Sequence, residues 1–510
     1  MPFATEEALR LLDAEADARR ASIRNHADPA RTGRIFYVAA SGDDRADGQS
    51  PGTAWRTLAR ASAAALAPGD SVLLRRGDIF RGNIICKSGV TYGAFGEGEK
   101  PRLYSHECDL ADPSLWELYD EKSNIWRLVT PILDVGTLWL DGGREVAYKH
   151  IPSYTREGRF AVRDEPTRAF VITRELTHDL DFYWHFDAIM TTRPYGGEDF
   201  PIPEVGDRSL GTLYLRSNRG NPGYAFASIE AAVRRTAVVV GGCDGVRVDN
   251  LAILYYGWHG VAAVGERVRG LTVTNCEIGC IGGVIHSYYG CDPNYPEGGR
   301  GTIGRLGNAV EIYGGCDDYL VENCYIHDCY DAGITHQVTT NGRHLYMTGI
   351  VYKNNLIERC VYGIEYFLDM TEGDTESYMD GVLIEGNMIR HSGEGWGQQR
   401  HNTHTPAHIK GWSFANAARN FVIRNNVFDR AGRRSLHLVA SASASCPVME
   451  GNTYVQYEGG LLGKRGGREC GEPADIVFDG GIEDAIKTVF GDTEAKVYTV
   501  KKGGTLTANL

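Results

Sequence analysis

The feature that most constrains the fold is a six-residue pattern that recurs along the second half of the chain. It consists of an apolar residue, a polar residue, Asn or Gly, often a second Asn or a Cys, and then two mostly apolar residues. Six copies read VTNCEI, VENCYI, YKNNLI, IEGNMI, IRNNVF and MEGNTY, and VDNLAI is a weaker seventh. Their third residues lie 25, 48, 31, 32, 39 and 26 residues apart. A unit of roughly 25 residues with insertions of variable length is typical of a solenoid.

Each position of the pattern predicts a structural role. Asn and Gly in the third position tolerate the left-handed backbone of a tight bend; they are Asn250, Asn275, Asn323, Asn354, Gly386, Asn425 and Gly451. A small thiol or a buried Asn in the fourth position can stack on the turns above and below, where an Asn side chain finds hydrogen bonds; these residues are Cys276, Cys324, Asn355, Asn387, Asn426 and Asn452. The sixth position predicts an inward apolar column of Ile253, Ile278, Ile326, Ile357, Ile389, Phe428 and Tyr454.

About three short strands in each unit, without a helical pattern, predict an all-β parallel β-helix. The alternative is an antiparallel sandwich with chance repetition, which would not keep Asn in register. The asparagine ladder and the opening block from Phe36 to Ile84 resemble the pectate-lyase-like superfamily of right-handed parallel β-helix proteins. The resemblance covers roughly residues 34–105 and 225–480 and implies a carbohydrate-active, glycoside-hydrolase-like member. The polygalacturonase motifs NTD, GxDD, GHG and RxK are absent in that order, so their mechanism is not carried over.

The pattern divides the chain into five parts. Residues 1–33 contain an amphipathic helix, expected to cap the open N-terminal end of the solenoid, because an exposed sheet edge must be covered. Residues 34–105 form the first coils, 106–224 an inserted small β domain, 225–480 the main β-helix, and 481–510 a C-terminal cap. Insertions at 286–306, 337–349 and 391–412 are expected to build the binding site, since solenoid insertions gather on one face.

Composition limits the partners. The net charge of −13 comes without a basic stretch, which argues against nucleic acid and an anionic membrane. The N-terminus lacks the pattern of a signal peptide and no apolar run approaches 18 residues. The twelve cysteines show no zinc-type pairs, and we interpret them as reduced thiols of a cytoplasmic protein. The alternative is a secreted protein that has lost its leader. The aromatic-rich insert is a possible interface of a homo-oligomer.

A second register aligns the strands HGVAAV, NAVEIY, AGITHQ, YGIEYF and SLHL. Alternation of side chains along a strand turns the third residue of each inward and the fourth outward. The inward residues are Val261, Val310, Ile334, Ile364 and Leu436, and the outward residues are Ala262, Glu311, Thr335, Glu365 and His437.

The outward residues suggest a catalytic pair. Glu311 and Glu365 are separated by one coil, so their backbones should lie roughly 9–10 Å apart. Inverting glycosidases hold their carboxyl groups about 6.5–9.5 Å apart and retaining ones about 5–5.5 Å apart. Asp331 precedes the middle strand and is the chief rival for either role. The alternative is a row of solvated carboxylates on an exposed sheet face.

Residues around this pair suit a sugar, although core packing explains each aromatic or histidine better when it is taken alone. The segment HNTHTPAH lacks the i, i+4 histidine pair of a helical zinc site, so we predict neither a metal nor a cofactor. The expected substrate contacts are Trp258, His259, Tyr313, His336, Tyr366, Asp369, Trp396, His401, His404, Lys410, Trp412 and His437.

These residues predict a glycoside hydrolase that acts on short, imported oligosaccharides. The second hypothesis is a polysaccharide lyase or uronate epimerase, which needs a base and a cation to neutralise the uronate; Lys410 with Arg400, or Arg343 with Lys353, would serve. The third is a carbohydrate-binding or tailspike-like protein without catalysis, which the paired glutamates oppose.

Overall fold

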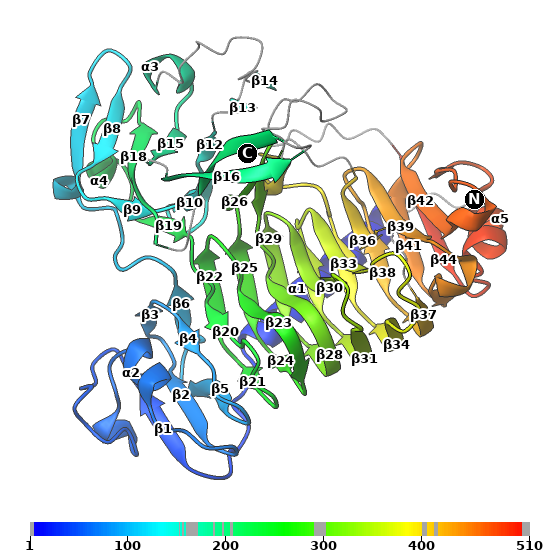
Figure 1. Ribbon diagram of the computed structural model, residues 1–510, viewed down its shortest axis with the longest axis horizontal. Helices are drawn as coiled ribbons and strands as arrows, with labels where there is room; N and C mark the ends of the chain where they lie inside the picture. The colour runs from blue at the N-terminus through cyan, green and yellow to red at the C-terminus, as the bar shows by residue number, and fades with distance from the viewer. Residues whose placement is uncertain are drawn as a thin grey trace.

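Parallel strands in the computed structural model stack coil upon coil into three long rows, which form the three faces of a right-handed parallel β-helix (Figure 1). The structure describes residues 5–151, 154–155, 158–159, 172–186, 189–195, 198–204, 208–289, 302–399, 405–412 and 417–501. The expected fold class is confirmed by the parallel pairing of successive coils.

The first stack carries the column of acidic residues. Its strands are β4 (Ile84–Ile85), β20 (Val238–Val239), β23 (Val261–Arg269), β28 (Val310–Glu322), β30 (Ala332–Thr339), β33 (Tyr362–Asp369), β36 (Ala407–Gly411), β39 (Arg434–Ala440) and β42 (Leu461–Gly467). The short β43 (Ile476–Val477) closes it antiparallel to β42.

The second stack follows each strand of the first after a bend, and the long β28 runs through both. Its other strands are β1 (Ile35–Val38), β2 (Ser71–Arg75), β5 (Thr91–Phe95), β21 (Arg247–Asp249), β24 (Thr272–Thr274), β31 (Tyr346–Lys353), β34 (Tyr378–Glu385), β37 (Ala418–Arg424) and β40 (Val448–Glu450).

The third stack follows the asparagine turn. It contains β3 (Ile79–Arg81), β6 (Arg102–Tyr104), β22 (Ala252–Tyr256), β25 (Glu277–Ile281), β29 (Tyr325–Cys329), β32 (Leu356–Glu358), β35 (Met388–Arg390), β38 (Val427–Asp429), β41 (Thr453–Tyr457) and β44 (Lys496–Val500).

The turn between the second and third stacks has the predicted chemistry. All seven third-position residues have a left-handed backbone, with φ between 51° and 68°. At the fourth position, the buried amides form a continuous chain in which Asn355, Asn387, Asn426 and Asn452 each donate from Nδ2 to the next acceptor at 2.9–3.0 Å. The last acceptor is the carboxylate of Asp492, which ends the ladder.

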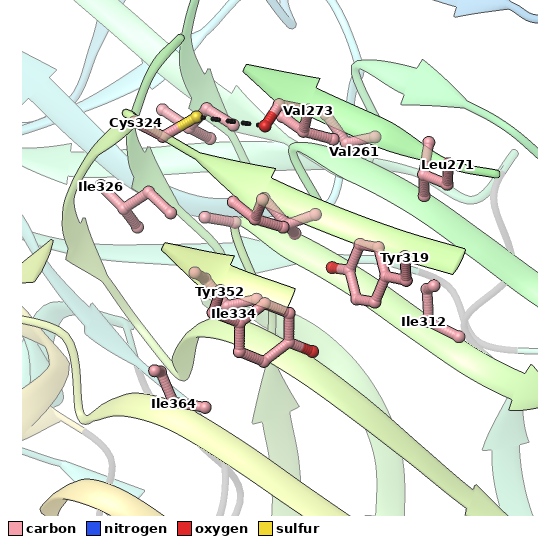
Figure 2. Packing of buried hydrophobic residues seen from close by; sticks show 14 of the residues in the cluster. Val261, Leu271, Val273, Ile312, Tyr319, Cys324, Ile326, Ile334, Tyr352 and Ile364 are labelled. Atoms are coloured by element: carbon pink, nitrogen blue, oxygen red, sulfur yellow. Dashed lines mark hydrogen bonds between the residues drawn. The ribbon is translucent and has the colours of Figure 1, made fainter. Parts of the chain in front are cut away.

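The core consists of the inward columns. Val261, Val310, Ile334 and Ile364 lie on four successive coils. Tyr319 and Tyr352 belong to the same core cluster (Figure 2). The sixth-position residues pair in register from coil to coil and are fully buried. The eleven cysteines in the described residues are free thiols, and Cys324 donates to the carbonyl of Val273 inside this core (Figure 2).

The N-terminal helix α1 (Glu6–Arg24) does not cap the end of the solenoid. It lies along the third stack, across several coils (Figure 1). Ala16 and Ile23 are buried against Tyr325, Leu356 and Met388. Three ion pairs connect the helix to this stack: Arg20 with Glu358, Arg24 with Glu277, and Asp13 with Arg390. The short helix α2 (Leu58–Ala63) packs on β4 at that end instead.

The expected insert is only partly a separate unit. Its own sheet contains β7 (Trp116–Asp120), β8 (Ile125–Leu128), β9 (Ile132–Leu133), β12 (Tyr148–His150), β15 (Asp181–His185) and β18 (Leu210–Arg216). However, β10 (Val135–Leu140) and β11 (Glu145–Val146) join the third stack through β19 (Ile229–Val233). The remaining elements here are α3 (Ile172–Glu175), α4 (Pro222–Ala225) and the pairs β13 (Tyr154–Thr155) with β14 (Gly158–Arg159) and β16 (Ile189–Tyr195) with β17 (Glu198–Glu204).

The C-terminal end is covered by a helical segment rather than by the terminal strand. Residues Phe478, Ile482, Ile486 and Phe490, in and beside α5 (Ile482–Ala485), are buried in the main core. The strand β44, which also lies in the expected cap of residues 481–510, extends the third stack in parallel with β41. Within the described ranges, no helix is both long and apolar enough to cross a membrane.

Candidate active site

Side chains of one outward column bring the candidate catalytic residues together. The pairing of β23, β28, β30, β33, β36, β39 and β42 aligns Ala262, Glu311, Thr335, Glu365, Lys410, His437 and Lys464 on successive coils. We call this row the outer column. It contains the five expected outward residues in the expected order, with Lys410 inserted between Glu365 and His437.

Glu311 is buried within a set of hydrogen-bond donors. Its carboxylate accepts from Asn308 Nδ2, from Thr335 Oγ1 at 2.9 Å and from Gln337 Nε2 at 3.0 Å. Glu311 is only 3% exposed. Burial raises the pKa of Glu311 above its ordinary value, although the hydrogen bonds from Gln337, Asn308 and Thr335 oppose that shift. A carboxyl group with a raised pKa is suited to donate a proton.

Glu365 lies beside a cation. Trp412 Nε1 donates to Glu365 Oε1, and Lys410 is the neighbour of Glu365 on the next strand. The Lys410 ammonium is 4.2 Å from the centre of the Trp412 ring and donates to Thr405 Oγ1 at 3.1 Å. Burial lowers the pKa of Lys410 to about 7, while the charge of Glu365 acts in the opposite direction. In its charged form, Lys410 favours the ionised form of Glu365.

Asp331 lies on the intervening coil, immediately before β30. It is buried, and its carbonyl accepts from the backbone N–H of Tyr362 at 3.1 Å. Asn308, which holds Glu311, and Tyr362, on which Trp412 packs, both lie at this same end of the strands. The three candidate carboxylates therefore come from three consecutive coils, with Asp331 near the strand starts and the glutamates three or four residues further along.

His259, on the preceding coil, supports Glu311 through Asn308. The backbone N–H of Asn308 donates to His259 Nδ1 at 3.2 Å, so His259 positions the residue that binds Glu311. Burial lowers the pKa of His259 to about 3, which keeps the ring neutral. Trp258 is half-buried, stacks on His286 with ring centres 5.3 Å apart, and lies 4.5 Å from the Arg234 guanidinium.

Two further expected contacts lie along the same strands. Tyr313 is half-buried and donates from its hydroxyl to Thr339 at 3.4 Å. Thr339 in turn donates to Asp369 at 3.3 Å. These residues form a polar patch two to four positions beyond the outer column.

Three expected substrate contacts are placed elsewhere. His336 and Tyr366 point into the core, where their rings stack 5.6 Å apart and His336 Nδ1 meets the Tyr352 hydroxyl at 2.8 Å. Both follow an outward residue directly, so alternation turns them inward. Trp396 packs on Trp139 and Tyr330 at the corner beside the insert, where it lines a cavity of about 730 Å³ with Gln399. His401 and His404 lie outside the described residues.

Sequence reasoning missed part of the site. Asn308 lies three residues before Glu311, and Gln337 lies two residues after Thr335, in segments that the second register had already aligned. These polar residues close to the outward positions were the available signal. Lys410 was assigned to the insertion at 391–412, but it belongs to a coil strand that reads AHIK. In this strand Ile409 pairs with Ile364 and Leu436 in the inward column, so Lys410, the next residue, points outward. In the part of the chain that the structure describes, no three His, Cys, Asp or Glu side chains group as metal ligands do.

Comparisons with known proteins identify distant structural likenesses. No protein-family model matches the chain, and no curated protein matches its sequence. The structure of XylC in complex with xylose is 14% identical, with a TM-score of 0.41 over 92% of this chain and 76% of that one. The GH136 lacto-N-biosidase from Eubacterium ramulus is 13% identical, with a TM-score of 0.37 over 97% and 71%. A rhamnogalacturonan lyase is 10% identical, with a TM-score of 0.39 over 87% and 79%. The chain is thus similar to carbohydrate-active β-helix enzymes, at a distance that leaves its activity to be argued from its own outer column.

Proposed function

We propose that this protein is a glycoside hydrolase that cleaves glycosidic bonds in short oligosaccharides. The observation that carries the proposal is the outer column, in which Glu311 and Glu365 share one face with a single coil between them. A pair of carboxyl groups that flank the scissile bond is the basic requirement of glycoside hydrolysis.

The surroundings of the two glutamates give them different roles. Glu311 is the general acid, because burial raises its pKa and favours the protonated form. Glu365 is the base, because its neighbour Lys410 supplies positive charge that favours the carboxylate. Environments that separate the pKa values of two carboxyl groups are the usual basis of such a division.

The spacing favours inversion of the anomeric centre. Two strand separations place the backbones of Glu311 and Glu365 roughly 9–10 Å apart. This leaves room for the water molecule that an inverting enzyme activates. If Asp331 replaces one glutamate, the partners come from adjacent coils, and a carboxyl separation near 5 Å would favour retention.

The test is a product assay with a panel of neutral and uronic-acid oligosaccharides. Hydrolysis adds one water to the products, which mass spectrometry detects, and proton NMR of the first product reports its anomeric form. Glu311→Gln and Glu365→Gln should each lower kcat by about 10²–10⁴. Glu322→Gln, the same change on β28 away from the outer column, should leave turnover intact. Activity of both outer-column variants near the wild-type level would refute the proposal.

One observation favours a second function. The pKa of Lys410, lowered to about 7 by burial, suits a base that removes the proton next to a uronate carboxylate. A lyase of this kind would release an unsaturated product without adding water, and the product would absorb in the ultraviolet. The same assay therefore separates the two functions.

A further inference from the structure

The outer column changes its charge along its length. Its N-terminal half presents Glu311 and Glu365, and its C-terminal half presents Lys410, His437 and Lys464 on consecutive coils. A glycan that lies along the helix axis therefore meets acidic groups first and basic groups one to three coils later.

Two of these basic residues form a buried pair. Lys410 and His437 are 2% and 8% exposed, and Lys410 Nζ lies 2.7 Å from His437 Nδ1. The charged ammonium of Lys410 can only donate, so in that form Nδ1 accepts and the neutral ring carries its proton on Nε2. Burial and the Lys410 charge keep the pKa of His437 far below its ordinary value, which maintains this neutral form.

The Nε2–H of His437 is a donor without a partner. Among the described residues, no hydrogen-bond acceptor meets this buried atom. His336 and His408 also have an unpaired Nε2, but both rings lie in the core, whereas His437 stands on the outward column. A buried donor without a partner loses its hydration without compensation, so a ligand acceptor at this position would restore the lost hydrogen bond.

The other cations nearby are already neutralised. Lys464 lies 3.0 Å from Glu472, and Arg434 forms a two-point pair with Asp475. Within the pair, Lys410 has Glu365 as its neighbour on the adjacent strand, and His437 Nε2 is the donor that meets no acceptor among the described residues.

We propose that the Lys410–His437 pair binds an anionic substituent of the glycan, the carboxylate of a uronic acid or a sulfate ester. This inference rests on the proposed function and narrows its substrate class. The anionic sugar lies on the C-terminal side of the carboxylates, with Lys410 providing charge and His437 Nε2 providing a directed hydrogen bond. Charge-assisted hydrogen bonds of this type are shorter and stronger than neutral ones.

The test measures binding by the full chain to an array of neutral, uronate-containing and sulfated glycans. Glu311→Gln serves as the background to prevent turnover, because Glu311 stands three coils from Lys410. For each anionic glycan that binds, calorimetry compares its affinity with that of its carboxyl-reduced or desulfated counterpart. Lys410→Met and His437→Leu remove the two donors, and His437→Gln retains both an acceptor for Lys410 and an outward donor.

A matched control separates this pair from general charge. Lys353→Met removes one positive charge on β31 in the second stack, where Lys353 is paired with Glu385. We expect Lys410→Met and His437→Leu to lower the affinity for anionic glycans roughly ten- to hundredfold. The affinity for neutral glycans should stay the same. His437→Gln and Lys353→Met should bind as the background does, and melting curves establish that each variant is folded.

The outcomes distinguish the inference from the function on which it rests. A preference for anionic glycans that disappears with Lys410→Met supports the site, and the uronate and sulfate arms identify the substituent. Binding of neutral glycans alone, or an anionic preference that survives both substitutions, overturns the site and leaves the hydrolase intact. Binding of no glycan overturns both.

Discussion

Thr335→Val tests the assignment of Glu311 as the general acid. Thr335 is fully buried between the two glutamates, and its hydroxyl donates to Glu311 Oε2 at 2.9 Å. Valine has nearly the same shape without the hydroxyl, so the change removes one hydrogen bond from the charged form of Glu311. The donors Asn308 and Gln337 remain.

The size of the effect follows from that single bond. A hydrogen bond to a charged group contributes about 1.5–3 kcal/mol, and one pKa unit corresponds to about 1.4 kcal/mol. The pKa of Glu311, already raised by burial, should therefore rise by roughly one to two units further.

The assay is the pH dependence of kcat/KM, which reports the groups of the free enzyme. A general acid must be protonated, so activity falls as the pH increases through its pKa. Raising that pKa moves the alkaline limb of the profile to higher pH by the same one to two units. If Glu311 were the base, the acidic limb would move instead.

Two variants control the experiment. Thr335→Ser keeps the hydroxyl and should restore the wild-type profile. Thr339→Val removes a hydroxyl from the same strand that donates to Asp369 rather than to Glu311, and should leave both limbs in place. An alkaline limb that does not move in Thr335→Val would refute the assignment of Glu311.

Three other predictions concern the base, the ladder and the N-terminal helix. Glu365→Gln should lower kcat by about 10²–10⁴ without changing the melting temperature, and a similar loss in Glu322→Gln would show that the effect is not specific to the site. Asn387→Leu should lower the free energy of unfolding by about 3–5 kcal/mol in urea titrations, because it breaks bonds to Asn355, Asn426 and the Tyr352 carbonyl; a loss below 1 kcal/mol would mean that the ladder is not a stability element. Ala16→Arg should detach α1, making it sensitive to limited proteolysis while turnover remains, since α1 lies on the third stack; loss of turnover with α1 still protected would contradict this.

The register of the coils could be predicted from particular residues. Asn275, Asn323 and Asn354 mark a bend where the backbone is left-handed, and few residues adopt that conformation at low cost. Once the bends are aligned, alternation along each strand assigns Glu311 and Glu365 to the outside and Ile334 to the core. The same alternation places His336 and Tyr366 inside, so those two expected contacts were inconsistent with the pattern itself.

Other features depend on contacts between distant parts of the chain. An amphipathic pattern indicates that α1 has an apolar face, but not whether that face covers an open end or a lateral sheet. Its position is decided by Tyr325, Leu356 and Met388, more than 300 residues away in sequence. Lys410 lies in the outer column because of the way the chain before it folds. The repeat pattern of the sequence does not predict this position.

The sequence by itself determined the coil, the ladder and the order of the acidic residues, because these follow from backbone preferences and from a period that each coil repeats. Only the tertiary structure decided what surrounds each carboxylate: Asn308, Thr335 and Gln337 on Glu311, and Trp412 and Lys410 on Glu365. Burial and neighbouring charge set the protonation of a carboxyl group, and both are properties of the assembled coils rather than of any one strand.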